Sequence, residues 1–355
     1  MSKRYLQSIK LVNDAGFRVG LLDYGATISS IMVPVDGRSL NVVLSYPKPA
    51  DYLRDSFYLG ATVGRYAGRI DRGRFTLNDR RYQLATGDNV HCLHGGPQGF
   101  SRQFWSVDMG SDSHSVTFRH LALDGDQGFP GKLAVSARYS LRGDYGLLIE
   151  YEAMSDAKTV INLSNHVYFN LNGNLNDNPI ESTSDISNHS IIINADRYAV
   201  PDQADIPTGE LRKVDGSRFD FRQATLLKDM ISEGGFGSEY GYDHTYELNG
   251  DGDKLAIAAE AHAPDSGLWL KVHTTQPALQ FYTGEYLDSP MHRRSGLCFE
   301  AQNFPDAPNQ PAFPCAVLEP GETYAHSILY EFGRTFIATT ASTSTTPGTI
   351  RGKDD

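Results

Sequence analysis

The most regular alternation of apolar and polar residues lies between residues 132 and 155. In its first half, apolar side chains occupy every second position, at Leu133, Val135, Ala137, Tyr139 and Leu141. Successive side chains of a strand point to opposite faces, so this pattern predicts a strand that buries one face. The pattern resumes after Gly143-Asp144 at residues 147–153, and the two segments therefore predict an antiparallel hairpin.

Shorter segments of the same kind recur along the chain, separated by turn residues. They cover residues 5–12, 17–22, 28–35, 75–77, 82–84, 116–123, 191–193, 268–272 and 279–281, with turns at Asp36-Gly37 and Asn78-Asp79. The one predicted helix spans Ala224 to Ser232, with an apolar stripe of Leu226, Leu227, Met230 and Ile231. Strands do not alternate with helices, which predicts an all-β fold, a large antiparallel sandwich or barrel with very little helix.

The 355 residues contain no internal repeat, and no linker divides residues 1–335. Large all-β folds often reach this length as one domain, so we predict a single domain over residues 1–337. Residues 338–355 are rich in Thr and Ser and lack periodicity, and we expect a flexible tail that contributes nothing to the core.

Composition narrows the class of protein. The formal net charge of -11 argues against a general nucleic-acid or anionic-membrane binder. No apolar run reaches transmembrane length, and residues 1–10 lack the apolar core of a signal peptide, so we expect a cytoplasmic protein. The cysteines, Cys92, Cys298 and Cys315, are odd in number and far apart, which is not the pattern of a disulfide framework.

The segment 162–171, NLSNHVYFNL, places polar side chains at the end of an apolar strand. With a period of two, His166, Tyr168 and Asn170 share one face of that strand. An imidazole, a phenol and an amide are costly to bury unless each is hydrogen-bonded. For His166 taken alone, a hydrogen-bonded histidine of the core is the simpler interpretation. A functional role for His166 therefore depends on which other polar segments the chain contains.

Two of these segments contain arginine or histidine beside glycine. The segment 60–70, GATVGRYAGRI, carries Arg65 and Arg69 but matches no phosphate-binding loop, and such arginines are usually surface ion pairs. His91 and His94 have a spacing that could bind a metal. No further His or Cys cluster lies nearby to complete a ligand set, so a hydrogen-bonding role is favoured.

Carboxylates form the other candidates. The acidic segment 124–131, DGDQGFPG, is typical of a solvated loop. In contrast, Asp243 and His244 begin a strand, and Glu300 follows an apolar strand and precedes a proline-rich loop. These positions are compatible with a site at strand ends.

Seven segments in series resemble the aldose 1-epimerases, or galactose mutarotases. They are GRYAGRI, LHGGPQGF, DGDQGFPG, NHVYFNL, DRYAVPDQADIPTGEL, YDHTY and FEAQNFPDAPNQPAFP, the last followed by LEPGETY. Each is a weak pattern alone, but together they keep the family's order over residues 10–333. The resemblance implies a single-domain β-supersandwich with a shallow sugar site on one concave face.

The same resemblance implies roles for individual residues. Glu300 would be the general base and His166 the general acid, with His94 in a supporting role. A further set would contact the sugar: Arg69, Asp243, Phe281 and Gln302. We expect no metal and no cofactor, because the sequence supplies no evident site for a cofactor and no complete metal-ligand set. The resemblance also implies a small aldose as the partner of a monomer or homodimer that binds neither nucleic acid nor membrane.

The chain departs from the family pattern at three positions. Gly68 stands where many relatives have Asn, Val167 where a small hydroxyl residue is common, and Ala301 where Thr is frequent. None of these residues is a proposed catalytic group, so the departures bear on sugar preference rather than on the reaction.

The proposed chemistry needs only an acid and a base. Exchanging the anomers of a sugar requires a base to take the anomeric hydroxyl proton and an acid to protonate the ring oxygen. At pH 7 a carboxylate is a base, and an imidazole with a pKa of about 6.5 can hold a proton. We expect the charge of Glu300 to raise the pKa of His166.

Three alternatives remain open at the level of sequence. One is a non-catalytic sugar-binding protein, which would not need both Glu300 and His166. Another is a glycosidase that uses Asp243 and Glu300 as paired carboxylates. The last is a metal-dependent hydrolase that uses His91, His94 and His166. For an epimerase of this family, a pentose, a furanose or a sugar phosphate is the alternative substrate to a hexose such as galactose or glucose.

Overall fold

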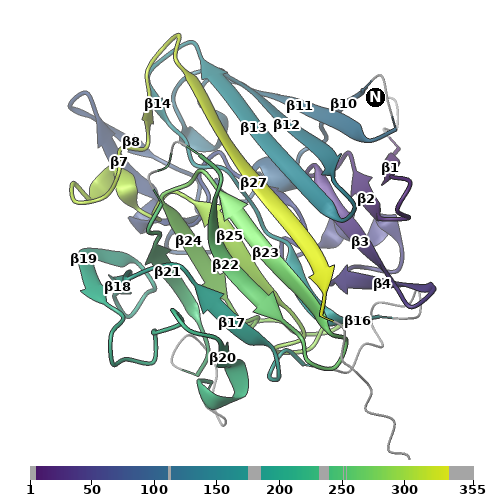
Figure 1. Cartoon of the computed structure of the whole chain (residues 1–355). Helices are drawn as coiled ribbons and strands as arrows, with labels where there is room; N and C mark the ends of the chain where they lie inside the picture. Colours follow the sequence, from purple (N-terminus) through teal and green to yellow (C-terminus); the bar gives the residue numbers. More distant parts are fainter. Residues whose placement is uncertain are drawn as a thin grey trace, which may run out of the picture.

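Two large antiparallel sheets stacked face to face form the molecule (Figure 1). The computed structural model describes residues 5–110, 113–174, 185–231, 240–250, 252 and 254–335. Every ladder within the two large sheets is antiparallel. The sequence-based prediction of a large antiparallel all-β fold is therefore confirmed.

The first sheet has ten strands and carries the site described below. In spatial order its strands are β1 (Ser8–Val12), β2 (Arg18–Leu22), β3 (Thr27–Val35), β4 (Arg38–Val43), β16 (Tyr168–Asn174), β25 (Leu297–Gln302), β24 (Ala278–Tyr282), β21 (Asp243–Glu247), β18 (Arg197–Pro201) and β19 (Pro207–Lys213). Strands from the two halves of the chain thus meet at its centre, where β16 pairs with β25.

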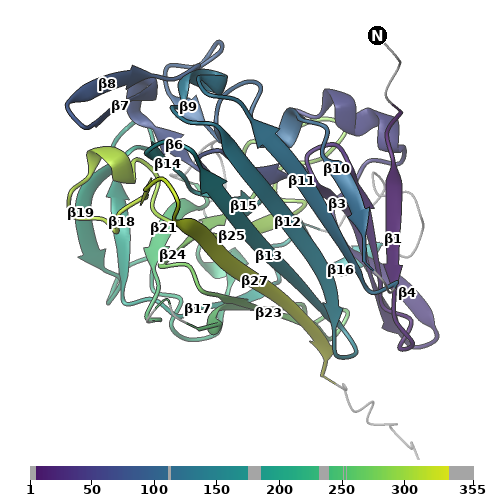
Figure 2. The ribbon, with the colours of Figure 1, turned by 90° about the horizontal axis from the view of Figure 1, so that it is seen from above.

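The second sheet has nine strands and covers one face of the first. Their order is β10 (Ser106–Met109), β11 (Ser115–Ala122), β12 (Leu133–Arg142), β13 (Gly146–Ser155), β27 (Thr323–Arg334), β23 (Leu268–Thr274), β22 (Ala256–His262), β17 (Ser190–Ile193) and β20 (Thr225–Leu226). Figure 2 shows β12, β13 and β27 running side by side across this sheet.

Short elements connect the strands of the two sheets. Two-stranded pairs are formed by β14 (Thr159–Val160) with β26 (Val317–Leu318), β15 (Ser164–Asn165) with β5 (Thr62–Val63), β6 (Arg69–Ile70) with β9 (Cys92–Leu93), and β7 (Arg74–Leu77) with β8 (Arg80–Gln83). The helical segments of the described residues are all 3₁₀ turns, namely η1 (Pro49–Arg54), η2 (Asp71–Gly73), η3 (Phe100–Arg102), η4 (Asp126–Gly128), η6 (Leu227–Asp229) and η7 (Ala307–Asn309). None of the described helical segments is long and apolar enough to cross a membrane.

The main core lies between the two sheets, and the period of two decides which residues enter it. On β25, Leu297, Phe299 and Ala301 are fully buried members of this core. Across the sheets, the rings of Phe169 and Tyr330 meet with their centroids 5.0 Å apart. The alternate residues of β25 must therefore point to the opposite face of the first sheet.

The three predicted hairpins are present, the first between β3 and β4 around Asp36-Gly37. β12 and β13 pair over their full length on either side of Gly143-Asp144, and β7 and β8 pair around Asn78-Asp79. Asn78 and Asp79 both have positive φ, of 50° and 58°, as a tight hairpin turn requires. The predicted tail falls on residues 338–355, which lie outside the described part of the chain.

The predicted helix at 224–232 is wrong. Thr225 and Leu226 form β20, which pairs with β17, and the described residues up to Ile231 then contain one 3₁₀ turn. The apolar stripe nevertheless faces the core, because Leu227 is a fully buried member of it and the half-buried Met230 and Ile231 pack against it. Pairing with a neighbouring strand satisfied the backbone of this segment, so tertiary contacts overrode the helical spacing.

Candidate active site

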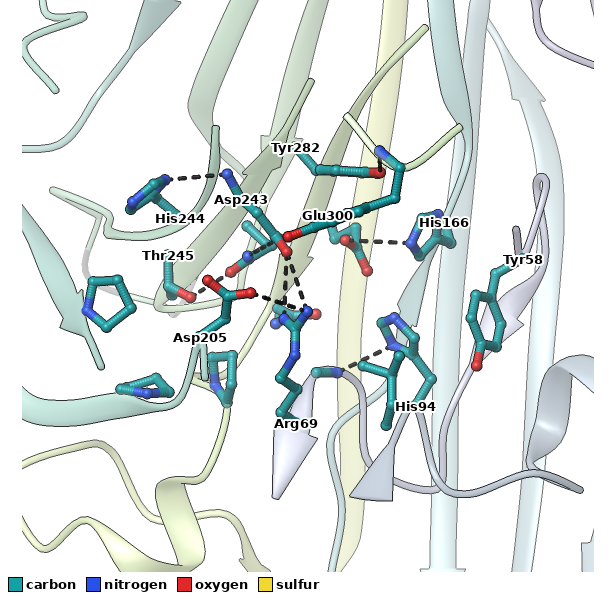
Figure 3. A pocket seen from close by; sticks show the side chains of 18 of the residues that line it. Tyr58, Arg69, His94, His166, Asp205, Asp243, His244, Thr245, Tyr282 and Glu300 are labelled. Carbon is teal, nitrogen blue, oxygen red and sulfur yellow. Dashed lines mark hydrogen bonds and ion pairs between the residues drawn. The ribbon is translucent and has the colours of Figure 1, made fainter. Parts of the chain in front are cut away.

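A pocket of about 250 Å³ opens on the face of the first sheet that points away from the main core. Figure 3 shows Glu300 near its centre, with His166 facing its carboxylate and Arg69 rising toward Asp243. The residues discussed below that line this pocket are Tyr58, Gly68, Arg69, His94, His166, Tyr168, Asp205, Asp243, Thr245, Gln280, Tyr282, Glu300 and Gln302.

Strand register brings the polar side chains together in rows. Thr245 of β21 lies opposite Gln280 of β24, which lies opposite Glu300 of β25. Side chains that face each other across neighbouring strands share one face of the sheet. These three residues, which are far apart in sequence, therefore form one row along the floor of the pocket.

A second row runs parallel to the first. It consists of Asp243 on β21, Tyr282 on β24, Cys298 on β25 and Tyr168 on β16. Because Cys298 and Glu300 are two positions apart on the same strand, the two rows share the face that carries the pocket.

His166 lies between β15 and β16, where the backbone holds it on both sides. Its N–H donates to the carbonyl of Ala61 at 2.9 Å, and its carbonyl accepts from the N–H of Gly60 at 3.0 Å. Its imidazole Nε2 is 3.7 Å from Glu300 Oε1. The predicted partners Glu300 and His166 are therefore neighbours, and both are almost completely buried.

Backbone geometry around His94 depends on glycine. His94 has a φ of 50°, and Gly95 follows with a φ of 85°. A Cβ at Gly95 would lie 2.1 Å from the carbonyl oxygen of Gly64, so no other residue fits there. The segment LHGG thus places the His94 ring against that of His166, with centroids 5.2 Å apart.

One hydrogen bond fixes the proton of the His94 ring. The backbone N–H of Gly68 donates to His94 Nδ1 at 3.2 Å. Burial, followed by the charges of His166 and Arg69, lowers the pKa of His94 well below its ordinary value, so the ring is neutral. A neutral imidazole that accepts at Nδ1 carries its proton on Nε2 and is a hydrogen-bond donor there.

Arg69 and Asp243 form the charged side of the pocket. Arg69 Nη1 lies 3.3 Å from Asp243 Oδ2, and its other terminal nitrogen lies 3.6 Å from Asp205. Gln280 Nε2 donates to the second oxygen of Asp243 at 2.6 Å. Both oxygens of Asp243 are thus engaged, which disfavours this residue as the second carboxylate of a glycosidase.

Burial governs the charges of the Glu300–His166 pair. It lowers the pKa of His166 to about 4 and raises the pKa of Glu300 well above its ordinary value. The expectation that the Glu300 charge raises the pKa of His166 is therefore wrong for the protein without sugar. Loss of hydration outweighs the attraction between the two groups, and the neutral pair, with the proton on Glu300, is favoured.

The described residues contain one group with the composition of a metal site. Possible ligand atoms of His94, His166 and Glu300 all lie within 4.8 Å of one another. However, Nε2 of neutral His94 carries a proton as long as Gly68 donates to Nδ1. A metal at Nε2 would have to break that bond, so this arrangement fits a hydrogen-bonding ligand better than an ion. His91 does not belong to this group, because it pairs with Asp71 at 3.1 Å.

The structure corrects one of the predicted sugar contacts. Phe281 does not line the pocket, because it is fully buried in the main core and stacks on Phe299 at 5.4 Å. Its neighbours on β24, Gln280 and Tyr282, line the pocket instead. Asn170 also lies outside the pocket lining, and its amide donates to the carbonyl of Ser295 at 2.9 Å.

Gln302 is the most unusual of the predicted contacts. Its side chain lines the pocket, is fully buried, and has no hydrogen-bond partner at either polar atom. A Cβ at Gly68 would lie 3.3 Å from Gln302 Nε2 and 2.8 Å from Pro305. Gly68 therefore leaves the Gln302 amide open to a ligand.

Sequence reasoning missed several lining residues and misjudged others. Tyr58, Asp205 and Gln280 were not predicted, although Gln280 could have been found from its position one residue before Phe281. Arg65, far from being a surface residue, is buried and donates to the carbonyls of Pro130 and Gly131 at 2.8 and 2.9 Å. The loop 124–131 is thus an anchor for this arginine as well as a surface connection.

Comparisons with known proteins agree with this fold. The sequence profile of the aldose 1-epimerase family matches residues 7–331. The aldose 1-epimerase of Escherichia coli K12 is 37% identical over 335 residues, which cover 91% of this chain and 94% of that protein. The galactose mutarotase of Bos taurus is 38% identical over 324 residues, or 89% of this chain and 91% of that protein.

Solved structures give the same result. A galactose 1-epimerase from Lactobacillus acidophilus superposes with a TM-score of 0.82 at 30% identity, covering 95% of this chain and 97% of that one. An aldose epimerase homologue from C. elegans reaches a TM-score of 0.84 at 27% identity, covering 94% of this chain and all of that one. The fold and the sequence are those of a carbohydrate isomerase. The chain belongs to the aldose 1-epimerase family.

Proposed function

We propose that this protein interconverts the α and β anomers of an aldose, with Glu300 as general base and His166 as general acid. The observation that supports this most directly is the pairing of Glu300 Oε1 with His166 Nε2 at 3.7 Å inside the pocket. The second carboxylate oxygen, Oε2, is buried and has no hydrogen-bond partner, so it is available to a sugar hydroxyl. A purely sugar-binding protein would gain nothing from this pair.

Ring opening uses the charge-separated form of the pair. The Glu300 carboxylate takes the proton of the anomeric hydroxyl while His166 Nε2 gives its proton to the ring oxygen. The bond between the anomeric carbon and the ring oxygen breaks, and a carbonyl forms at that carbon. Glu300 is then protonated and His166 neutral, which is the arrangement that burial favours.

Re-closure returns both protons. After rotation about the adjacent carbon–carbon bond, His166 Nε2 takes the proton of the ring hydroxyl, and Glu300 protonates the carbonyl oxygen. The other anomer forms and the pair regains its starting state. Each positioned proton transfer contributes roughly 10²–10⁴ in rate, and no cofactor is required.

The remaining polar groups hold the sugar. His94 Nε2–H is a neutral donor beside the reacting atoms, and the Gln302 amide offers both a donor and an acceptor. Arg69 and Asp243 present charged groups suited to neighbouring hydroxyls. The relatives named for galactose suggest hexoses such as galactose and glucose as substrates. We further propose a cytoplasmic monomer or homodimer.

Polarimetry tests the proposed function. Freshly dissolved α-glucose, α-galactose, xylose and arabinose should each reach their equilibrium rotation faster with the protein than without it, and a hexose should respond most. Glu300→Gln protein at the same concentration is the control. Spontaneous rates for all four sugars would refute the function.

We expect Arg69→Lys to raise KM for the preferred hexose at least several-fold. A guanidinium holds two acceptors in fixed geometry, whereas an ammonium is a point charge. Asp243→Asn should raise KM as well, because it removes the negative charge that holds Arg69 at 3.3 Å. Steady-state kinetics would show this.

Arg72→Lys is the matched control for this prediction, since the Arg72 side chain is 69% exposed and does not line the pocket. Its KM should equal that of the unmodified protein. If Arg69→Lys also left KM unchanged, Arg69 would have no role in holding the sugar.

A further inference from the structure

A buried thiol lies against the imidazole of His166. Cys298 Sγ is 3.6 Å from His166 Nδ1, while Nε2, the other ring nitrogen, is 3.7 Å from Glu300 Oε1. Cys298 and Glu300 leave β25 on the same face because they are two positions apart. One strand therefore supplies a partner to each nitrogen of the same ring.

Packing holds this contact in place. Cys298 lies opposite Tyr168 on one side and Tyr282 on the other. The rings of both tyrosines also lie against His166, with centroid distances of 5.0 and 6.4 Å. Cys298 has no exposed surface, and burial raises the pKa of its thiol well above the ordinary value, so the group stays uncharged.

We propose that Cys298 is a positioning residue for His166. Its sulfur holds the ring with Nε2 directed at the sugar, and it accepts a hydrogen bond from Nδ1–H, whose proton stays on nitrogen once Nε2 has given its own proton to the ring oxygen. This inference rests on the proposed role of His166 as the acid.

The positions of the two imidazole protons during the reaction explain why the ring needs a partner at Nδ1. In ring opening, the N–H bond at Nε2 breaks, a bond forms between that proton and the ring oxygen, and His166 becomes neutral. Its remaining proton must stay on Nδ1, because the lone pair at Nε2 has to take the hydroxyl proton back during closure. The other tautomer, with its proton on Nε2, cannot do this.

The chemistry of sulfur suits this task. A thiol is a weak donor and a weak acceptor, and because the protonated Glu300 faces Nε2, the ring proton lies on Nδ1 and the uncharged thiol is its acceptor. A carboxylate in the same place would form a charge-assisted hydrogen bond and hold the imidazolium proton more strongly. Cys298 thus orients His166 without weakening it as an acid.

Substitutions at Cys298 test the proposal. Cys298→Val fills the space without an acceptor, and we expect kcat to fall about tenfold. This loss is smaller than the roughly 10⁴-fold loss in serine proteases when the aspartate that orients the catalytic histidine is replaced by asparagine, because a thiol is a weaker partner than a carboxylate. KM should change little, because the thiol is not needed to hold the sugar. Cys298→Ser restores an acceptor and should recover most of the lost kcat. Cys92→Ala removes another buried thiol, in a separate hydrophobic cluster, and should leave kcat unchanged.

Nitrogen-15 NMR of histidine-labelled protein shows directly which ring nitrogen of His166 carries the proton. Near neutral pH, His166 should carry its proton on Nδ1 in the unmodified protein and shift toward the Nε2 tautomer in Cys298→Val. Unchanged kcat or an unchanged tautomer in Cys298→Val would overturn the proposal, as would Cys298→Ser activity no higher than that of Cys298→Val. Failure of the proposed function is seen separately, as full kcat in His166→Asn.

Discussion

Glu300→Gln should lose at least a hundredfold in kcat, with KM for the sugar changed far less. The amide keeps the shape of the side chain and its contacts with hydroxyls but cannot take the anomeric proton, and a general base contributes roughly 10²–10⁴ in rate. A loss confined to kcat identifies an interaction that acts in the transition state. Polarimetry at saturating galactose measures it.

The same substitution should not damage the fold. Burial already favours the uncharged form of Glu300, so a neutral amide of the same size costs little and should leave the melting temperature unchanged or higher. Glu260→Gln is the control, since Glu260 pairs with Lys271 on the second sheet, away from the pocket. Its kcat should be unaffected. If Glu300→Gln kept more than about a tenth of the normal kcat, Glu300 could not be the base.

Much of the fold followed from local patterns. The alternation in residues 133–155 identified β12 and β13, and the Asn78-Asp79 turn identified β7 and β8. These signals are local, because a strand shows its buried face through its own side chains. Pairing between distant strands has no such signal, and the sequence alone gave no reason to place β16 beside β25.

For the site, too, some features could be predicted from the sequence and others depended on the whole fold. Glu300, His166, His94, Arg69, Asp243 and Gln302 were placed by resemblance to a family, and the structure gathers them around one pocket. Phe281 was assigned to the wrong face because the period of two was not carried from Glu300 across the register to Gln280. The pKa of His166 could not be anticipated either, since burial is a property of the whole fold.

A plot of kcat/KM against pH should be bell-shaped, because the active pair holds one proton. Below about pH 4, the pKa of His166, the pair holds two protons and the base is lost, so activity rises with pH through this value. At high pH the pair loses its only proton and the acid is lost. Burial of Glu300 moves this alkaline limb well above the ordinary carboxyl pKa. Both limbs belong to the coupled pair rather than to single residues.

The Glu300→Gln variant gives the sharper test of this pH dependence. With no carboxyl group to hold the proton, residual activity depends on the imidazolium of His166 alone, so it should fall as pH rises through about 4. The alkaline limb thus moves to lower pH in the variant. NMR titration of the His166 ring without sugar should give a midpoint near pH 4. An alkaline limb at the same pH in both proteins would show that Glu300 does not share the catalytic proton. We expect kcat of His166→Asn to be impaired as strongly as kcat of Glu300→Gln, and this variant would then test whether His166 alone holds that proton.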